Sequence, residues 1–100
     1  MSEPRVIFHP LVQKDLERVL KYYSDEVGLN LADRFFTLFL QVVNQAVLNP
    51  HYFHPVNATQ RRANLPGFPY HFLYRITKYG IRVNVLRHDR QKPDYGLRRK

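Results

Sequence analysis

The spacing of apolar residues changes at about residue 60, and this change constrains the fold more than any other feature of the sequence. Between residues 12 and 48 the apolar side chains recur every three to four positions, as they do along one side of an amphipathic helix. Beyond residue 60 they alternate with polar side chains, which is typical of strands. The sequence therefore predicts an α+β fold in which two helices precede most of the sheet.

The predicted helices form a hairpin. The first begins after His9-Pro10 and carries the apolar stripe Val12, Leu16, Val19, Leu20, Tyr23 and Val27. Gly28 suits the left-handed residue that ends a helix. The second helix runs from Leu31 to Leu48 and is ended by Asn49-Pro50. Because the connection is so short, the two helices are expected to pack antiparallel.

Four strands complete the predicted order β-α-α-β-β-β. A short strand at 5–8 precedes the helices, and strands at 61–65, 70–76 and 81–88 follow a loop at 51–59. We expect the helical hairpin to pack on one face of a small antiparallel sheet, as a single domain over residues 1–100. Residues 94–100 are a candidate for a flexible basic tail.

Alternation along the last two strands predicts one apolar face and one polar face. The face expected against the helices holds Tyr70, Phe72, Tyr74, Ile76, Ile81, Val83 and Val85. The opposite face is expected to be open and cationic, and holds His71, Leu73, Arg75, Arg82, Asn84, Leu86 and His88, with Arg62 and Asn64 beside them. An ordinary solvated outer face is the alternative.

The positive charge of the chain lies entirely in its C-terminal part. Residues 1–58 hold five basic and six acidic side chains, net −1, whereas residues 59–100 hold eleven basic and two acidic ones, net +9. Such an asymmetry indicates an anionic partner, either a polyanion or an acidic protein. The candidate residues for binding it are Arg61, Arg62, His71, Arg75, Arg82, Arg87 and Arg90.

The sequence offers few routes to catalysis. It has no cysteine and no phosphate-cradling glycine loop, and a metal site at His51-x-x-His54 lacks a carboxylate partner, so no cofactor or metal is expected. Metal-free RNA cleavage stays possible, with a histidine as acid or base and arginines stabilising the charged transition state. In that case the catalytic residues would be His88, Arg62, Arg75 and Arg90, with His71 and Arg82 as further candidates. Whether the chain is an enzyme is left open.

Absence of cysteine suits a reducing compartment, and no apolar run approaches the roughly 20 residues that span a bilayer. We therefore expect a cytoplasmic protein without a membrane partner.

Several short motifs, in their order and spacing, resemble the RelE/ParE superfamily of toxins from type II toxin–antitoxin systems. The helical half carries Asp15-Leu16, Tyr22-Tyr23, Gly28, Ala32, Phe35 and Pro50. The second half is similar to the ParE branch through Arg62 with Leu65, Phe68-Pro69-Tyr70, Tyr74, His88-x-Arg90 and Pro93. Val12 departs from the alanine usual in the family.

The resemblance implies two helices on one face of a small antiparallel sheet, and a plasmid-stabilisation type of toxin. It implies a cognate antitoxin that is acidic and partly disordered and folds on binding. ParE-like members resemble inhibitors of DNA gyrase, whereas RelE-like members are similar to ribosome-dependent mRNA endonucleases. RelE-like cleavage relies on lysine, arginine and a C-terminal tyrosine or histidine, and here Lys78, Lys92 and Tyr95 fall in a turn or the tail. The motifs therefore favour gyrase, with an mRNA interferase and an inactive antitoxin-binding protein as alternatives.

Overall fold

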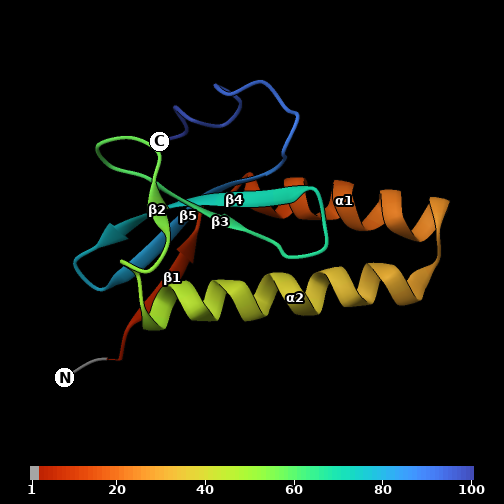
Figure 1. The fold of residues 1–100 in the computed structure, drawn as a ribbon, viewed down its shortest axis with the longest axis horizontal. Helices are drawn as coiled ribbons and strands as arrows, with labels where there is room; N and C mark the ends of the chain where they lie inside the picture. The colour runs from red at the N-terminus through yellow and green to blue at the C-terminus, as the bar shows by residue number, and fades with distance from the viewer. Residues whose placement is uncertain (1–2) are drawn as a thin grey trace.

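The computed structural model describes residues 3–100, and its helices form the predicted hairpin. Helix α1 spans Val12–Glu26 and helix α2 spans Leu29–Leu48. Between them Gly28 has a φ of 146°, a conformation that side chains with a Cβ rarely adopt, and its N–H donates to the carbonyl of Tyr23. The chain therefore reverses within two residues, and α1 returns against α2 (Figure 1).

The sheet has five strands, in the spatial order β1-β5-β4-β3-β2. The strands are β1 (Arg5–Phe8), β2 (His54–Pro55), β3 (Arg61–Asn64), β4 (Tyr70–Thr77) and β5 (Gly80–His88). Neighbours from β2 to β5 are antiparallel, as predicted, while β1 pairs with β5 in parallel. A parallel pair needs a long connection, and β1 and β5 are joined through every other element of the fold. The two-residue strand β2 lies inside the segment expected to be a loop.

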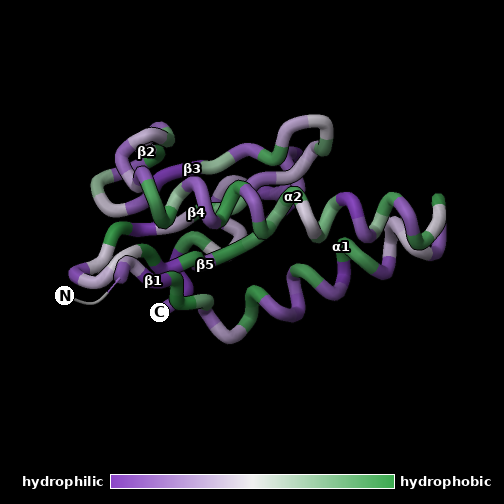
Figure 2. Tube along the Cα trace, turned by 90° about the horizontal axis from the view of Figure 1, so that it is seen from below, coloured by the Kyte–Doolittle hydropathy of each residue, from purple (hydrophilic) through white to green (hydrophobic). Residues whose placement is uncertain are grey.

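The helices cover one face of this sheet and build the core with it. Phe35 and Phe39 of α2 meet Tyr70 and Phe72 of β4 in edge-to-face ring contacts, with centroids 5.4 and 5.7 Å apart. Figure 2 shows hydrophilic and hydrophobic segments alternating along α1, as expected of an amphipathic helix. The predicted fold class is thus confirmed. Among residues 3–100, no helix has the length and hydropathy needed to cross a bilayer.

A β-bulge at Asn84 corrects part of the predicted face assignment. Leu73 and Tyr74 are consecutive in β4, yet they pair with Val85 and Val83, so Asn84 has no partner in the register. One extra residue reverses the alternation beyond it. Leu86 therefore joins the core and Val85 points to the opposite face, the reverse of the prediction for both.

The face opposite the helices is not open along its whole length, which is a second correction. Residues 89–100, hereafter the tail, cross it on the side away from α2 (Figure 1). Leu73, His71 and Asn84, all predicted to be exposed there, are no more than 1% exposed. Gly96 packs so closely on Val85 that a Cβ at this glycine would lie 2.4 Å from Val85 Cγ2. The basic end of the chain is therefore a packed part of the domain in this structure.

Candidate functional site

His71 lies at the centre of the covered half of the far face. Its Nδ1 is 2.7 Å from Asp89 Oδ1, and its Nε2 accepts a hydrogen bond of 2.9 Å from Arg87 Nε. Since Nε2 accepts, Nδ1 carries the proton and the ring is neutral. Burial, together with the nearby Arg62 and Arg87, lowers the pKa of His71, although Asp89 acts to raise it. A histidine with both nitrogens engaged cannot take a proton from an outside substrate without rearrangement.

Arg87 joins this cluster to the tail. Its NH1 donates to the carbonyls of Pro93 and Tyr95, at 2.7 and 3.0 Å, and the residue is 9% exposed. Arg62 lies at the rim, where it donates to Asp89 at 3.3 Å and keeps 36% of its side chain exposed. Two of the predicted binding residues, His71 and Arg87, are thus used to hold the tail on the sheet.

Arg75 and Arg82 form the uncovered half of the far face. They occupy directly opposite positions on β4 and β5, next to the turn that joins these strands. Both are partly exposed, and within residues 3–100 neither forms an ion pair with a carboxylate. This end of the sheet therefore keeps the cationic character predicted for the whole face.

The remaining predicted site residues lie elsewhere. Arg61 points to the helix side and donates to the carbonyls of Phe53 and His51, so it fixes the loop before β2. His88 also lies on the helix side, contrary to the prediction, because the bulge pairs it with Tyr70, whose ring centroid is 5.0 Å away. Arg90 follows in an exposed turn, where its N–H donates to His88 Nδ1.

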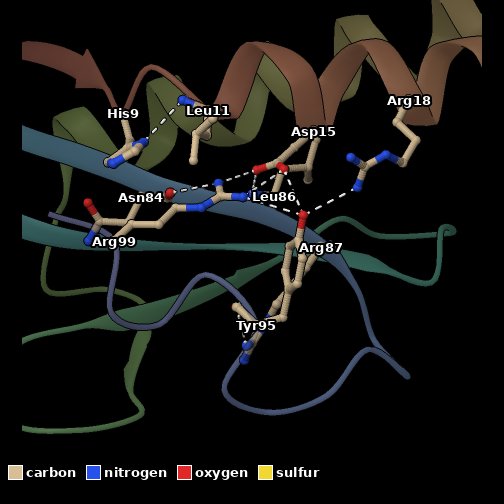
Figure 3. Close-up of polar contacts among 9 residues, drawn as sticks. All are labelled: His9, Leu11, Asp15, Arg18, Asn84, Leu86, Arg87, Tyr95 and Arg99. Carbon is tan, nitrogen blue, oxygen red and sulfur yellow. Dashed lines mark hydrogen bonds and ion pairs between the residues drawn. The ribbon is translucent and has the colours of Figure 1, made fainter.

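Asp15 and Arg99 form a buried ion pair that the sequence reasoning missed. Asp15 is on α1, 3% exposed, and its carboxylate accepts from both guanidinium NH groups of Arg99, at 2.6 and 3.0 Å (Figure 3). The bond to Asp15 raises the pKa of Arg99. The Tyr95 hydroxyl, which accepts from Arg18 at 3.2 Å, donates to the same carboxylate at 3.4 Å. The sequence did contain a signal for this pair, because Asp15 lies on the apolar stripe of a helix, where a charged side chain needs a buried partner.

The pair completes the edge of β5 beyond the end of β1. Asp15 Oδ2 accepts from the backbone N–H of Leu86 at 3.1 Å, and Arg99 NH1 donates to the carbonyl of Asn84 at 3.2 Å. In Figure 3 the Arg99 side chain extends along β5, and the Asp15 carboxylate reaches it from α1. The tail is consequently fastened at two places, to His71 and Arg87 on the far face and to Asp15 at the edge.

An apolar groove lies between the two helices and the end of β1. It measures about 350 Å³, and its apolar lining includes Phe8, Val12, Leu16, Phe36, Phe39 and Leu40. Phe36 and Leu40, one turn apart on α2, are 40% and 46% exposed and add apolar surface to the groove. In residues 3–100, by contrast, no group of three or more His, Asp or Glu side chains is placed to hold a metal ion.

The comparisons with known proteins agree with this architecture. In fold, the chain is similar to a solved structure titled "Chromosomal ParDE TA system from P. aeruginosa", with a TM-score of 0.75 at 15% identity, over 86% of this chain and 96% of that one. No curated protein matches the sequence significantly. A family model described as "ParE toxin of type II toxin-antitoxin system, parDE" matches residues 6–95. Since that model covers most of the sequence, the chain belongs to the ParE toxin family of type II toxin–antitoxin systems.

Proposed function

We propose that this toxin acts by binding DNA gyrase, and that a cognate antitoxin neutralises it. The observation that carries the first part is the separation of His88 from Arg62. The sequence named both as candidates for the competing RNA cleavage reaction, yet His88 lies with Tyr70 on the helix side and Arg62 lies on the far side. A general acid or base must reach the same substrate as the groups that stabilise the transition state. These two side chains lie on opposite faces of the sheet.

His71 does not replace His88 in that reaction. It is 1% exposed, and its two nitrogens are engaged by Asp89 and Arg87. The tail would therefore have to leave the sheet before His71 could meet an RNA strand. Inhibition of gyrase by binding needs no such step, and this difference favours gyrase as the target.

The neutralising partner is supported by the apolar groove. Its exposed Phe36 and Leu40, and the net charge of +9 over residues 59–100, suit a partner segment with both apolar and acidic side chains. An acidic, partly disordered antitoxin that folds on binding has this character. Co-expression with the product of the neighbouring reading frame should restore growth and give a co-purifying complex. A product that neither binds nor protects contradicts this part of the proposal.

Induction of the chain without a partner tests the target. Gyrase inhibition predicts filamentation with an SOS response, and purified protein should block supercoiling by gyrase in vitro. The double variant Arg62→Ala with His88→Ala should remain as toxic as the wild type, because neither residue has a catalytic role in this reading. Codon-linked cuts in mRNA that vanish in the double variant would establish the nuclease instead. Unaffected growth on induction of folded protein indicates an inactive antitoxin-binding protein.

A further inference from the structure

A small pocket opens between α1 and the last residues of β5, and it shares no lining residue with the apolar groove between the helices. Its volume is about 230 Å³. Val19 of α1 and Leu86 of β5 line it and are no more than 5% exposed, so part of its surface is apolar and buried. Three aromatic rings line it as well, those of Tyr22, Tyr70 and His88. The pocket therefore offers a flat ligand both buried apolar contact and ring contact.

The bulge at Asn84 brings His88 into this pocket. Without the extra residue, alternation would turn His88 to the far face. With it, the imidazole ring lies 5.0 Å from the ring of Tyr70, at an interplanar angle of 79°. The Tyr70 ring is itself fixed by edge-to-face contacts with Tyr23 and Phe35 of the helices. Two nearly perpendicular rings leave a corner in which a third ring can stack on one and meet the edge of the other.

The pocket also holds hydrogen-bond donors that are not used. Nδ1 of His88 accepts the backbone N–H two residues later at 3.0 Å, so Nε2 carries the proton and has no acceptor among residues 3–100. Arg18 is exposed and donates to the Tyr95 hydroxyl (Figure 3), but it forms no ion pair in the described part of the chain. Asp15, the carboxylate that lines the pocket, is held by Arg99. Donors of this kind, one of them charged, favour an anionic ligand.

We propose that this pocket, hereafter the α1–β5 pocket, binds a small aromatic acid. The ring of the ligand lies on Val19 and Leu86 beside Tyr70, and its carboxylate accepts from Arg18 and from Nε2 of His88. Pockets that enclose drug-sized ligands measure roughly 300–1,000 Å³. The smaller volume here suits one ring or two fused rings with a short acid arm, and a nucleotide would project from it. Such a site is independent of the gyrase target and of the antitoxin.

Titration of the purified free toxin with indole-3-acetate, followed through its backbone amide and aromatic NMR signals, tests the site. The signals of Val19, Tyr70 and Leu86 should shift, with a dissociation constant below about 1 mM. The neutral isostere indole-3-acetamide should bind at least about tenfold more weakly, because it lacks the charge. Signals that do not shift at millimolar indole-3-acetate, or shifts confined to Phe36 and Leu40 of the apolar groove, overturn the proposal. So does AMP that shifts the pocket signals when indole-3-acetate does not.

Arg18→Gln removes the charged donor at an exposed position of α1. It should weaken indole-3-acetate at least about tenfold and change the affinity for indole-3-acetamide less than about twofold. Lys14→Gln, also exposed on α1 but outside the pocket, removes the same charge and should change both affinities less than about twofold. Unchanged affinity in Arg18→Gln, or an equal loss in the two variants, would mean that the acid is not held by Arg18, and overturns the proposal.

His88→Phe keeps an aromatic ring in the pocket and removes the Nε2 donor. It should weaken indole-3-acetate about tenfold while indole-3-acetamide binds nearly as before. The melting temperature of each variant shows whether its fold is intact, and Arg18→Gln, at an exposed site, keeps the test open if His88→Phe does not fold. Unchanged affinity for the acid in folded His88→Phe contradicts the placement of the carboxylate at Nε2.

Discussion

The carboxylate of Asp15 and the guanidinium of Arg99, 84 residues apart in sequence, form a two-pronged ion pair in which both side chains are nearly buried. Each also bonds to the backbone of β5, at Leu86 and Asn84. One contact thus joins the first helix, the last strand and the end of the chain. Burying an ion pair carries a large desolvation cost. Removing one partner is therefore expected to destabilise the fold by more than the intact pair stabilises it.

Asp15→Ala should therefore lower the free energy of unfolding by about 3–5 kcal/mol. It leaves Arg99 without its partner and the N–H of Leu86 without an acceptor. Asp15→Asn should cost less, because an amide oxygen can still accept from Leu86. Urea denaturation of both variants measures the difference.

The control for Asp15 is Asp25, also on α1. Its ion pair with Lys21 is solvent-exposed on both sides, and such pairs contribute little to stability. Asp25→Ala should leave the urea midpoint unchanged. Equal losses of stability at the two positions would mean that the buried pair stabilises the fold no more than the exposed pair does.

Gly96 sets how closely the tail can approach the sheet. Its φ is 71°, and a Cβ would lie 2.4 Å from Val85 Cγ2. Gly96→Ala should push the tail away from β5, at a cost of about 2–4 kcal/mol from strain and overpacking together. Faster hydrogen exchange at the amides of residues 94–99 and earlier proteolysis of the tail are the expected signs.

The variant Gly67→Ala is the control that separates backbone strain from steric contact in the Gly96→Ala experiment. It has a φ of 85°, comparable to that of Gly96, but no atom lies within 4 Å of the position that a Cβ would take there. Gly67→Ala should cost only the conformational part, about 1–2 kcal/mol, without releasing the tail. If the two variants behave alike, the contact with Val85 does not hold the tail.

The contribution of the buried Tyr74 hydroxyl to stability can be measured by a substitution that removes only this oxygen. Tyr74 is fully buried, its hydroxyl donates to the carbonyl of Pro50 at 2.6 Å, and burial raises its pKa. Tyr74→Phe should leave that carbonyl without this donor and lower the free energy of unfolding by about 1–2 kcal/mol. Tyr52→Phe, at a residue 68% exposed, should be neutral in the same thermal melts.

The element order could be predicted because hydrophobic periodicity decides it locally. Phe72, Tyr74, Ile81 and Val83 all reach the core, as alternation predicts. Alternation fails at Leu86 and His88, because one unpaired residue at Asn84 shifts every later side chain to the other face. A bulge is set by the pairing of two strands, so a pattern read along one strand does not contain it.

The tail could not be predicted for a different reason. Its order comes from single long-range contacts, such as Arg99 with Asp15 and Gly96 with Val85, and no periodic pattern records them. A basic run at a chain end is ordinarily solvated. Of the predicted binding residues, Arg75 and Arg82 are consequently partly exposed, whereas His71 and Arg87 are buried, contrary to the prediction that they are accessible.

The buried His71 makes stability depend on pH in the mildly acidic range. Burial lowers its pKa below the unfolded value of about 6.5, so the folded state binds fewer protons than the unfolded state. Stability should be complete above pH 7 and should decrease as the pH falls through 6.5 toward the folded pKa. Besides Asp89, the charged groups around the ring are Arg62 from β3 and Arg87 from β5, which both oppose protonation. Urea denaturation between pH 7.5 and 5 follows this decrease.

His71→Gln should flatten that pH dependence, whatever it does to stability at pH 7.5, because the side chain no longer titrates. Part of the slope should persist, since burial, with Arg82 and Arg99 nearby, also lowers the pKa of His9. His9→Gln in addition should remove the rest. His54→Gln, at an exposed position of β2, is the control and should keep the full slope. A slope equal in wild type and His71→Gln would show that His71 is not the neutral, buried ring that holds Arg87 in place.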